Sequence, residues 1–479
     1  MKVLMLGWEY PPHIAGGLGT ACHGLTTALA RHDVEIHFVV PHLHGGEPAG
    51  HMTLTDSRDS MLRLRTGAGK RGDDGDSSHI RPSGAQLGPK SGPRITKQSV
   101  AAFLKPYWSP REFSAAVKKV VTEHSSHVIK LSDGVVDEIS RALIDGDVYG
   151  VDVASALLHG GMADAGSGYT EPTESYGATI FEEVERFTAH VINLTAGRAF
   201  DVIHAHDWMT FPAGVALAQL TGKPLVVHVH SLEYDRSGIS VNEQINQLER
   251  FGLSAATKII AVSHYTARSI QKYHNISPDK IAVVHNGAYP RQAVQGYKLK
   301  KTWPRNVVLF LGRITAQKGP DYFVEVASRV IPLVPDVLFV LAGTGDLLPR
   351  VMERVQVLGL DDSFLFPGFL QGEELEEMFS IADLYVMPST SEPFGISALE
   401  AISFDTPVII SRQSGVSEVL DHALKVDFWD IDRMADLIVN GLLHQELRQE
   451  MVKNSKVELA SLHWDAAAEK TVEVYRALR

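Results

Sequence analysis

The chain has 479 residues, of which 44% are hydrophobic and 21% are charged. This length exceeds what one compact core usually fills, so two or three domains are expected. The formal net charge of −12 excludes the broad basic surface of a nucleic-acid-binding protein, but it does not exclude a local phosphate site.

The single cysteine, Cys22, excludes an intrachain disulfide and favours a reducing compartment. No motif of a nucleophile surrounds it, so we interpret it as a small buried helix residue. No apolar stretch is long enough to cross a bilayer, and the apolar start at residues 1–7 is too short for a signal-peptide core. These features predict a cytoplasmic protein without a transmembrane segment.

The chain opens with the order of a βαβ unit. Residues 2–6 form a short apolar run typical of a buried parallel strand, and a glycine-rich turn follows at residues 16–19. A helix is then predicted from about residue 20 to residue 30, and a second strand at residues 34–40. This order is typical of a Rossmann-like domain.

Residues 56–98 interrupt this pattern. They are rich in Gly, Ser, Arg, Lys and Asp and have almost no apolar periodicity. Such a segment has too few apolar side chains to join a core, which predicts a disordered surface insertion. The acidic run at residues 73–76 within it is interpreted as solvated charge and not as a metal site.

Alternating strands and helices then continue to the end of the chain. Strands are predicted in the first half at residues 201–204, 224–229, 258–262 and 281–284, and in the second half at residues 307–312, 337–342, 364–366, 384–387 and 408–410. Helices are predicted between them, among them residues 322–330 and 396–402. The pattern predicts two doubly wound α/β domains, residues 1–295 and 306–462, joined by a polar linker at residues 289–305. An amphipathic helix at residues 463–479 ends the chain.

One candidate site follows the predicted strand at residues 384–387, at the carboxyl end of a sheet, where open α/β folds bind ligands. The segment Ser-Glu-Pro-Phe-Gly-Ile-Ser-Ala-Leu-Glu ends at Glu400. Its proline and Gly395 predict a turn, and the helix after it offers free N–H groups that favour a phosphate. Glu392 in the turn and Glu400 on the helix can reach different parts of one ligand. The alternative is an ordinary strand–turn–helix with a solvated glutamate.

A second candidate segment follows the predicted strand at residues 307–312. Arg313 and Lys318 would bring two cations to the same end of the sheet, which is enough to balance the charge of a diphosphate. An arginine suits a bidentate phosphate contact, and a lysine acts as a point charge. The alternative is surface salt bridging.

Together these two segments resemble glycosyltransferase family 4, the retaining nucleotide-sugar transferases of the GT-B fold, in which two Rossmann-like domains face a central cleft. The resemblance covers nearly the whole chain apart from the insertion and the linker. It implies that Glu392 contacts the donor sugar and Glu400 the ribose, and that Arg313 and Lys318 stabilise the leaving diphosphate. Further donor contacts are implied for Gly343, Gly345, Phe394, Gly395 and Ile396. The last helix resembles the segment that crosses back to the first domain in this fold.

The amino-terminal half resembles glycogen and starch synthases. Their glycine loop approaches the donor phosphates, which implies this role for Gly16, Gly17 and Leu18. His206, in His-Ala-His-Asp-Trp after a predicted strand, matches the histidine that these enzymes place beside the donor sugar. An imidazole there can donate a hydrogen bond to a hydroxyl or carry a proton.

The acceptor side is expected near His230 and Glu233, which follow the strand at residues 224–229. The synthases also carry a lysine shortly before the paired glycines, where this chain has Ile14 and Ala15. Because of this departure, polyglucan synthesis does not follow from the resemblance, and the acceptor stays open.

The resulting prediction is a retaining hexosyltransferase that moves a hexose, with glucose as the leading interpretation, to a carbohydrate such as an α-glucan. A lipid or a small sugar is the alternative acceptor, and ADP, UDP and GDP donors are all compatible with the sequence. No cofactor and no metal is expected to be required, because side chains and amides neutralise the diphosphate. The Asp-x-Asp at residues 145–147 mimics a metal motif of another transferase fold and is interpreted as a turn.

Three rival functions fit the sequence less well. A sugar-nucleotide 2-epimerase shares the fold but matches the four charged residues less well. A non-catalytic binding protein would be expected to lack one of those residues. A phosphorylase would need a pyridoxal-phosphate lysine motif, for which the sequence gives no convincing candidate.

Overall fold

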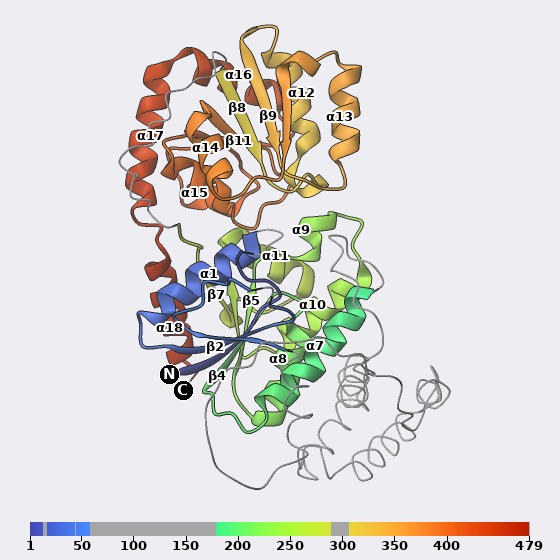
Figure 1. Cartoon of the computed structure of the whole chain (residues 1–479), viewed down its shortest axis with the longest axis vertical. Helices are drawn as coiled ribbons and strands as arrows, with labels where there is room; N and C mark the ends of the chain where they lie inside the picture. Colours follow the sequence, from blue (N-terminus) through green and yellow to red (C-terminus); the bar gives the residue numbers. More distant parts are fainter. Residues whose placement is uncertain (13–16, 44, 58–178, 289–305, 479) are drawn as a thin grey trace, which may run out of the picture. The chain divides into compact units, whose positions relative to one another are not determined.

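The computed structural model describes residues 1–12, 17–43, 45–57, 179–288 and 306–478. All of them belong to one compact unit of the chain, formed by Met1–Ser57 and Gly168–Arg479. Figure 1 shows two parallel sheets with their helices, one built before and one after residue 300. The predicted insertion beyond Ser57 and the predicted linker at residues 289–305 lie outside the described residues.

The first sheet has seven strands in the order β3-β2-β1-β4-β5-β6-β7, and every described pairing is parallel. Its central strands are apolar runs that are buried along their length, as expected for a parallel sheet covered on both faces. The strands are β1 (Lys2–Leu6), β2 (Glu35–Val40), β3 (Thr53–Asp56), β4 (Val202–His206), β5 (Leu225–Val229), β6 (Lys258–Ala261) and β7 (Ile281–Val283). Its helices are α1 (Gly17–Ala30), α7 (Thr179–Thr195), α8 (Phe211–Thr221), α9 (Glu233–Ser237), α10 (Glu243–Ala255) and α11 (His264–His274).

The second sheet has six parallel strands in the order β10-β9-β8-β11-β12-β13. The strands are β8 (Asn306–Leu311), β9 (Val337–Ala342), β10 (Phe364–Gly368), β11 (Leu384–Met387), β12 (Val408–Ser411) and β13 (Leu424–Val426). Its helices are α12 (Pro320–Val330), α13 (Leu348–Val357), α14 (Glu373–Ile381), α15 (Ile396–Ser403), α16 (Ile431–Leu443) and α17 (Gln445–Leu459).

Alternate residues of β8 enter two different cores, one on each face of the second sheet. Val307 and Leu309 pack with residues of α14 and α15, whereas Val308 and Phe310 pack with residues of α12, α13 and α16. This follows from the two-residue period of a strand. The predicted fold class, two doubly wound parallel sheets, is confirmed.

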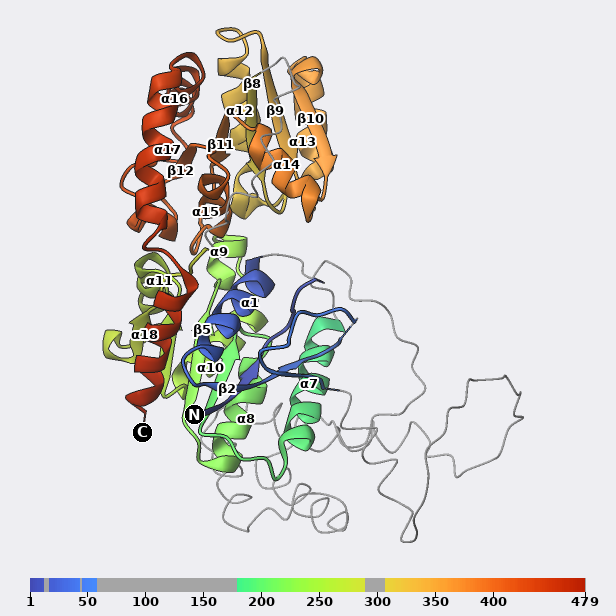
Figure 2. The ribbon, with the colours of Figure 1, turned by 60° about the vertical axis from the view of Figure 1, so that its left-hand side comes forward.

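The last helix, α18 (Trp464–Arg476), packs on the first sheet although it follows the second in sequence. It lies alongside α1 in both views (Figures 1 and 2), and Trp464 and Tyr475 are buried in the core that α1 shares with β1 and β2. Gly24 of α1 makes this approach possible, because a Cβ there would lie 2.2 Å from the Trp464 ring. No described helix has the length and apolar character that crossing a membrane requires.

Three expectations about elements are corrected. Strands β3 and β13 had not been predicted, since both are short edge strands with polar residues. Asp56 was predicted to begin the insertion, but it is the last residue of β3 and is buried. Its carboxylate accepts a hydrogen bond there from the Leu43 N–H at 3.1 Å. Strand β4 extends through His206, which therefore lies in the strand and not after it.

Candidate functional site

Each sheet has one place where the strand order reverses. In the second sheet the chain runs from β8 through β9 to β10 on one side, and from β11 through β12 to β13 on the other. The loops after β8 and β11 thus leave the carboxyl edge in opposite directions, and open α/β sheets bind ligands at this point. The two charged segments predicted from the sequence are these two loops.

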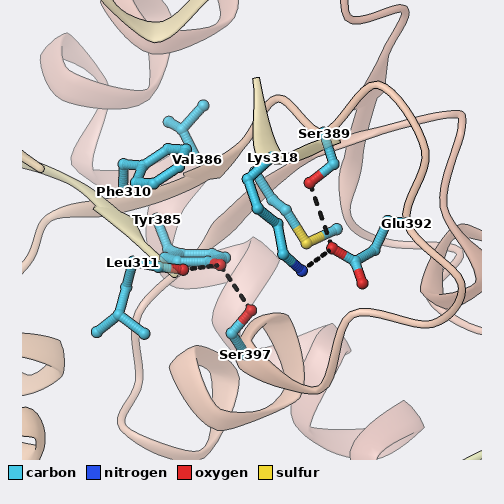
Figure 3. Close-up of a pocket in the computed structure, with 9 residues that line it drawn as sticks. Phe310, Leu311, Lys318, Tyr385, Val386, Ser389, Glu392 and Ser397 are labelled. Carbon is cyan, nitrogen blue, oxygen red and sulfur yellow. Dashed lines mark hydrogen bonds and ion pairs between the residues drawn. The ribbon is translucent and has the colours of Figure 1, made fainter. Parts of the chain in front are cut away.

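An ion pair joins the two loops. The Lys318 Nζ donates to Glu392 Oε2 at 2.6 Å, and the Ser389 hydroxyl donates to the same oxygen at 3.3 Å (Figure 3). The Glu392 side chain is 7% exposed and that of Lys318 is 23% exposed, so the pair is largely shielded from solvent. A charge-assisted hydrogen bond of this length holds both groups in one orientation.

The same pocket contains polar groups that the sequence did not single out. The Tyr385 hydroxyl lies 2.7 Å from the Ser397 Oγ and donates to the Leu311 carbonyl at 3.4 Å (Figure 3). Burial raises the pKa of Tyr385 well above its ordinary range, so the hydroxyl stays protonated. It links the end of β8 to the first turn of α15. A tyrosine in a buried strand that ends at a predicted site was the available signal.

Helix α15 begins as predicted. Gly395 precedes it with a φ of 106°, a conformation that favours glycine, and Phe394 is buried in the core beneath the turn. Ile396 starts the helix, and Glu400 lies one turn further on and is half-buried. Figure 3 shows Lys318 and Glu392 together, whereas the residues that line this pocket in the described part of the chain do not include Glu400.

The loop after β9 supports the loop after β8. A Cβ at Gly343 would lie 1.9 Å from the Gly312 carbonyl oxygen, and one at Gly345 would lie 2.4 Å from that of Ile314. The Ile314 N–H also donates to the Thr344 carbonyl at 2.8 Å. These glycines are therefore required by close backbone packing, and their contact with a donor stays a prediction. Arg313, which lies between Gly312 and Ile314 in sequence, is exposed.

The first sheet reverses between β1 and β4, and the amino-terminal candidates lie there. Gly17 and Leu18 begin α1 after β1, and the Gly19 N–H donates to Glu9 Oε1 at 2.9 Å. His206 is the last residue of β4 and is fully buried. Gly16, Ile14 and Ala15 lie outside the described residues.

Four histidines form a stacked array at this edge. The array comprises His204, His206, His228 and His230, from β4, β5 and the residue after β5. His206 pairs with His228 in register, and four ring pairs stack with centroids 4.3–5.3 Å apart. The His206 and His230 rings are tilted by 30°, with centroids 5.3 Å apart. Two histidines two residues apart point to one face of a strand, so the repeated His-x-His pattern was a signal that the sequence prediction did not use.

Hydrogen bonds connect the array in two chains. The His206 Nδ1 lies 3.0 Å from the His230 Nε2, and the His204 Nε2 lies 3.3 Å from the His228 Nδ1. The Tyr475 hydroxyl of α18 closes the second chain at 2.5 Å from the His204 Nδ1. Burial lowers the pKa of His204 and of His230 to about 3, and it holds the pKa of His206 and His228 well below the ordinary value. The rings are therefore neutral near pH 7.

Asp207 fixes the ends of β4 and β5 relative to each other. Its carboxylate accepts from the His230 N–H at 2.7 Å and from the Ser231 N–H at 3.4 Å. Burial raises its pKa to about 7, although these N–H groups favour the charged form. Asp207 is thereby a positioning residue for His230.

Glu233 lies in a network of hydrogen bonds around α9. Its carboxylate accepts from Arg236 at 3.1 Å, from the Ser237 hydroxyl at 2.5 Å and from the Asn242 N–H at 3.2 Å. It is 4% exposed. This network stabilises α9, and the acceptor-side role of Glu233 stays a prediction.

Side chains of α9 and of the start of α11 hold the segment that carries Glu392. The Ser391 hydroxyl donates to Asp235 Oδ1 at 2.6 Å and lies 2.9 Å from the Tyr265 hydroxyl. The Ser263 hydroxyl donates to the Pro393 carbonyl at 2.6 Å. Glu392 is thus flanked on both sides by hydrogen bonds to α9 and the start of α11.

Comparison with protein families assigns the chain's segments consistently. Residues 297–458 match the model described as glycosyl transferases group 1. Residues 169–291 match the model of glycosyltransferase family 4, and residues 2–69 match the model of the starch synthase catalytic domain.

Individual proteins extend this similarity over the whole length. The chain is 31% identical to an alpha-maltose-1-phosphate synthase of Mycolicibacterium smegmatis over 314 residues, which cover 58% of the chain and 79% of that protein. It is 23% identical to a glycogen synthase of Mycobacterium tuberculosis over 100% of the chain and 95% of that protein. A sucrose-phosphate synthase structure from Thermosynechococcus elongatus superposes with a TM-score of 0.66 at 17% identity, covering 100% of the chain and 98% of that structure's chain.

Proposed function

The chain belongs to the glycosyltransferases of the GT-B fold, and from this premise we propose that it transfers a hexosyl unit, with retention, from a nucleotide-diphosphate sugar to a carbohydrate. The observation that carries the proposal is the Lys318–Glu392 pair at the reversal between β8 and β11. It places a cation and a carboxylate beside the start of α15, where a sugar diphosphate presents an anion and hydroxyls.

In the proposed reaction the bond between the anomeric carbon and the phosphate oxygen breaks as the bond to the acceptor oxygen forms on the same face. A phosphate oxygen of the leaving diphosphate takes the acceptor's proton. Negative charge grows on the diphosphate, and Arg313, Lys318 and the free N–H groups of α15 stabilise it. Removing one such preorganised group typically lowers the rate by about 10²–10³.

His206 is proposed to contact a hydroxyl of the donor sugar. A neutral imidazole with one protonated nitrogen can donate or accept there, and burial keeps the pKa of this ring low enough for the neutral form. Glu400 is proposed to hold the ribose, and Gly17 and Leu18 to approach the donor phosphates.

An α-glucan is the acceptor that we propose first. The starch synthase model at residues 2–69 and the full-length similarity to a glycogen synthase support it. A small sugar or a lipid is the second candidate. The similarity to an alpha-maltose-1-phosphate synthase and a sucrose-phosphate synthase favours a small sugar phosphate within that group.

Purified protein incubated with ADP-, UDP- and GDP-hexoses, with glycogen or a small sugar phosphate as the acceptor, tests the proposal. The expected product carries an α linkage from an α-linked donor, seen in the anomeric proton coupling. A β linkage would disprove retention, conversion of the donor without an acceptor would indicate an epimerase, and donor binding without turnover would indicate a binding protein.

The same assay tests the proposal that no metal is required. EDTA should leave activity largely intact, whereas Lys318→Ala should lower kcat by about two orders of magnitude. Loss of activity in EDTA with rescue by Mg²⁺ or Mn²⁺ would show that a metal neutralises the diphosphate.

A further inference from the structure

Five side chains with nitrogen or sulfur donors gather at the carboxyl edge of the first sheet: Cys22 of α1 and the four histidines of the array. The Cys22 sulfur and one ring nitrogen each of His206 and His230 lie within 4.8 Å of one another. From this cluster we propose that Cys22, His206 and His230 form a binding site for a thiophilic divalent cation, with Zn²⁺ as the best fit.

The donor set matches this chemistry. Thiolate and imidazole are the ligands that Zn²⁺ prefers, and hard cations such as Mg²⁺ prefer oxygen. Three protein ligands leave the fourth tetrahedral position to water or a ligand hydroxyl. The ligands come from α1, from the end of β4 and from the residue after β5, so three rigid elements hold them.

A second observation points to a ligand at the same place. His206 is fully buried, yet its Nε2 has no hydrogen-bond partner among the described residues, and the same is true of the His228 Nε2. Buried polar atoms are almost always paired, because leaving one unpaired is costly. His204, His206 and His228 also place one nitrogen each within 4.8 Å of one another, so the cluster offers a second set of donors that shares His206.

The electrostatic setting favours a cation. Burial raises the pKa of the Cys22 thiol most, and the negative charges of Glu9 and Asp207 raise it further. An ion that bound the thiolate would compensate that charge, and binding would release the thiol proton. The rings of His206 and His230 are already linked at 3.0 Å, so little movement is needed to bring their nitrogens to one ion.

Zinc bound at this site should inhibit hexosyl transfer. This consequence rests on the proposed function. A zinc ion bound to His206 would hold the ring that is proposed to contact the donor sugar. The proposed zinc site is therefore inhibitory, and it is distinct from a metal that would bind the donor diphosphate.

Binding is measured without reference to activity. The metal-free protein is titrated with Co²⁺, whose sulfur-to-cobalt charge-transfer band reports thiolate ligation, and Zn²⁺ affinity follows by competition. The expected result is one site per chain with this band. Cys22→Ser should abolish the band, and Cys22→Ser and His230→Asn should each weaken Zn²⁺ binding by more than about 100-fold, since even a group behind a ligand contributes roughly 10–100-fold.

His444→Asn is the matched control, because His444 is exposed at the start of α17 and far from the array in sequence. It should bind Zn²⁺ like the original protein. No saturable binding, a Co²⁺ spectrum without the sulfur band, or equal affinity in Cys22→Ser and the control would overturn the site. Tight binding without inhibition would retain the site and instead contradict the proposed role of His206, and circular dichroism verifies that each variant is folded.

Discussion

At the scale of single residues, the ion pair of Lys318 and Glu392 joins two charges whose separation would be costly. Their largely shielded position means that removing one partner leaves the other uncompensated, so single substitutions act on stability as well as on rate. Each single substitution at this pair is therefore compared with the original protein in thermal stability as well as in rate.

The two glutamates of the α15 segment should separate by role. Glu392 lies in the pocket beside Lys318, so Glu392→Gln should lower kcat by about 10²–10³. Glu400 is proposed to hold the ribose, which changes little during the reaction, so Glu400→Gln should chiefly raise KM. Steady-state kinetics with a saturating acceptor decide this. If both variants raised KM alike and kept kcat, Glu392 would be a binding residue only.

The histidine array should make the protein sensitive to acid. Burial lowers the pKa of His204 and His230 to about 3, so between about pH 3 and pH 6.5 the unfolded chain binds protons that the folded chain does not. Stability is then lost as the pH falls below about 6.5, by roughly 1.4 kcal/mol per pH unit for each ring. Asp207 has the opposite effect on stability, because its pKa is raised to about 7 and the folded chain therefore binds a proton that the unfolded chain does not. Its contribution offsets the loss of stability from about one histidine ring.

The thermal midpoint between pH 7 and pH 5 tests this. It should fall on acidification, and it should fall less in His228→Asn, which removes one titrating ring. If the thermal midpoint stayed constant between pH 7 and pH 5, the rings would accept protons in the folded state. The same conclusion would hold for His228 if the midpoint fell equally in His228→Asn and in the original protein.

At the scale of elements, the loops where the strand order of the second sheet reverses depend on close backbone packing. Gly343→Ala should lower the thermal midpoint, because its φ of 136° is strained for alanine and its Cβ would meet the Gly312 carbonyl. Gly359→Ala is the matched control, since Gly359 has a φ of 67° with open space around it. Its only expected cost is backbone strain of about 1–2 kcal/mol. Equal effects of the two variants would show that the loop can move aside.

The end of the edge strand β3 limits how much of the predicted insertion can be deleted without loss of stability. Deleting residues 58–98 should leave the midpoint nearly unchanged, because the composition predicts no core contacts there. Deleting residues 56–98 should lower it, since Asp56 accepts from Leu43 and lies 3.4 Å from the His42 Nδ1. A fall of more than about 10 °C with the shorter deletion would show that the segment packs, given roughly 2–4 °C per kcal/mol.

At the scale of the whole molecule, side chains of the first sheet's helices hold the segment that carries Glu392. Ser391→Ala removes the bonds to Asp235 and Tyr265 and should lower kcat by roughly 10-fold, since a hydrogen bond to a charged group contributes about 1.5–3 kcal/mol. Ser403→Ala removes one bond inside α15 and should behave like the original protein. If Ser391→Ala changed only KM, the contact would serve donor binding and not the placement of Glu392.

Local patterns in the sequence were enough to predict most elements and the loops that carry the candidate residues. Buried parallel strands are continuous apolar runs, and the turn at Gly395 before α15 is set by a residue with positive φ. For this reason β1, β9 and β11 were predicted at their observed bounds. Edge strands such as β3 lack that signal, because their side chains are partly exposed and polar.

Strand order decided the rest, because it is a long-range property that no local pattern encodes. Lys318 and Glu392 are 74 residues apart in sequence and meet only because β8 and β11 are neighbours. Likewise the pairing of β4 with β5 in its observed register stacks His206 on His228, and the return of α18 brings Tyr475 to His204. From its residues alone the chain could be identified as a glycosyltransferase with two Rossmann-like domains, whereas the ion pair, the histidine array and its cysteine neighbour depend on contacts that only the folded chain brings together.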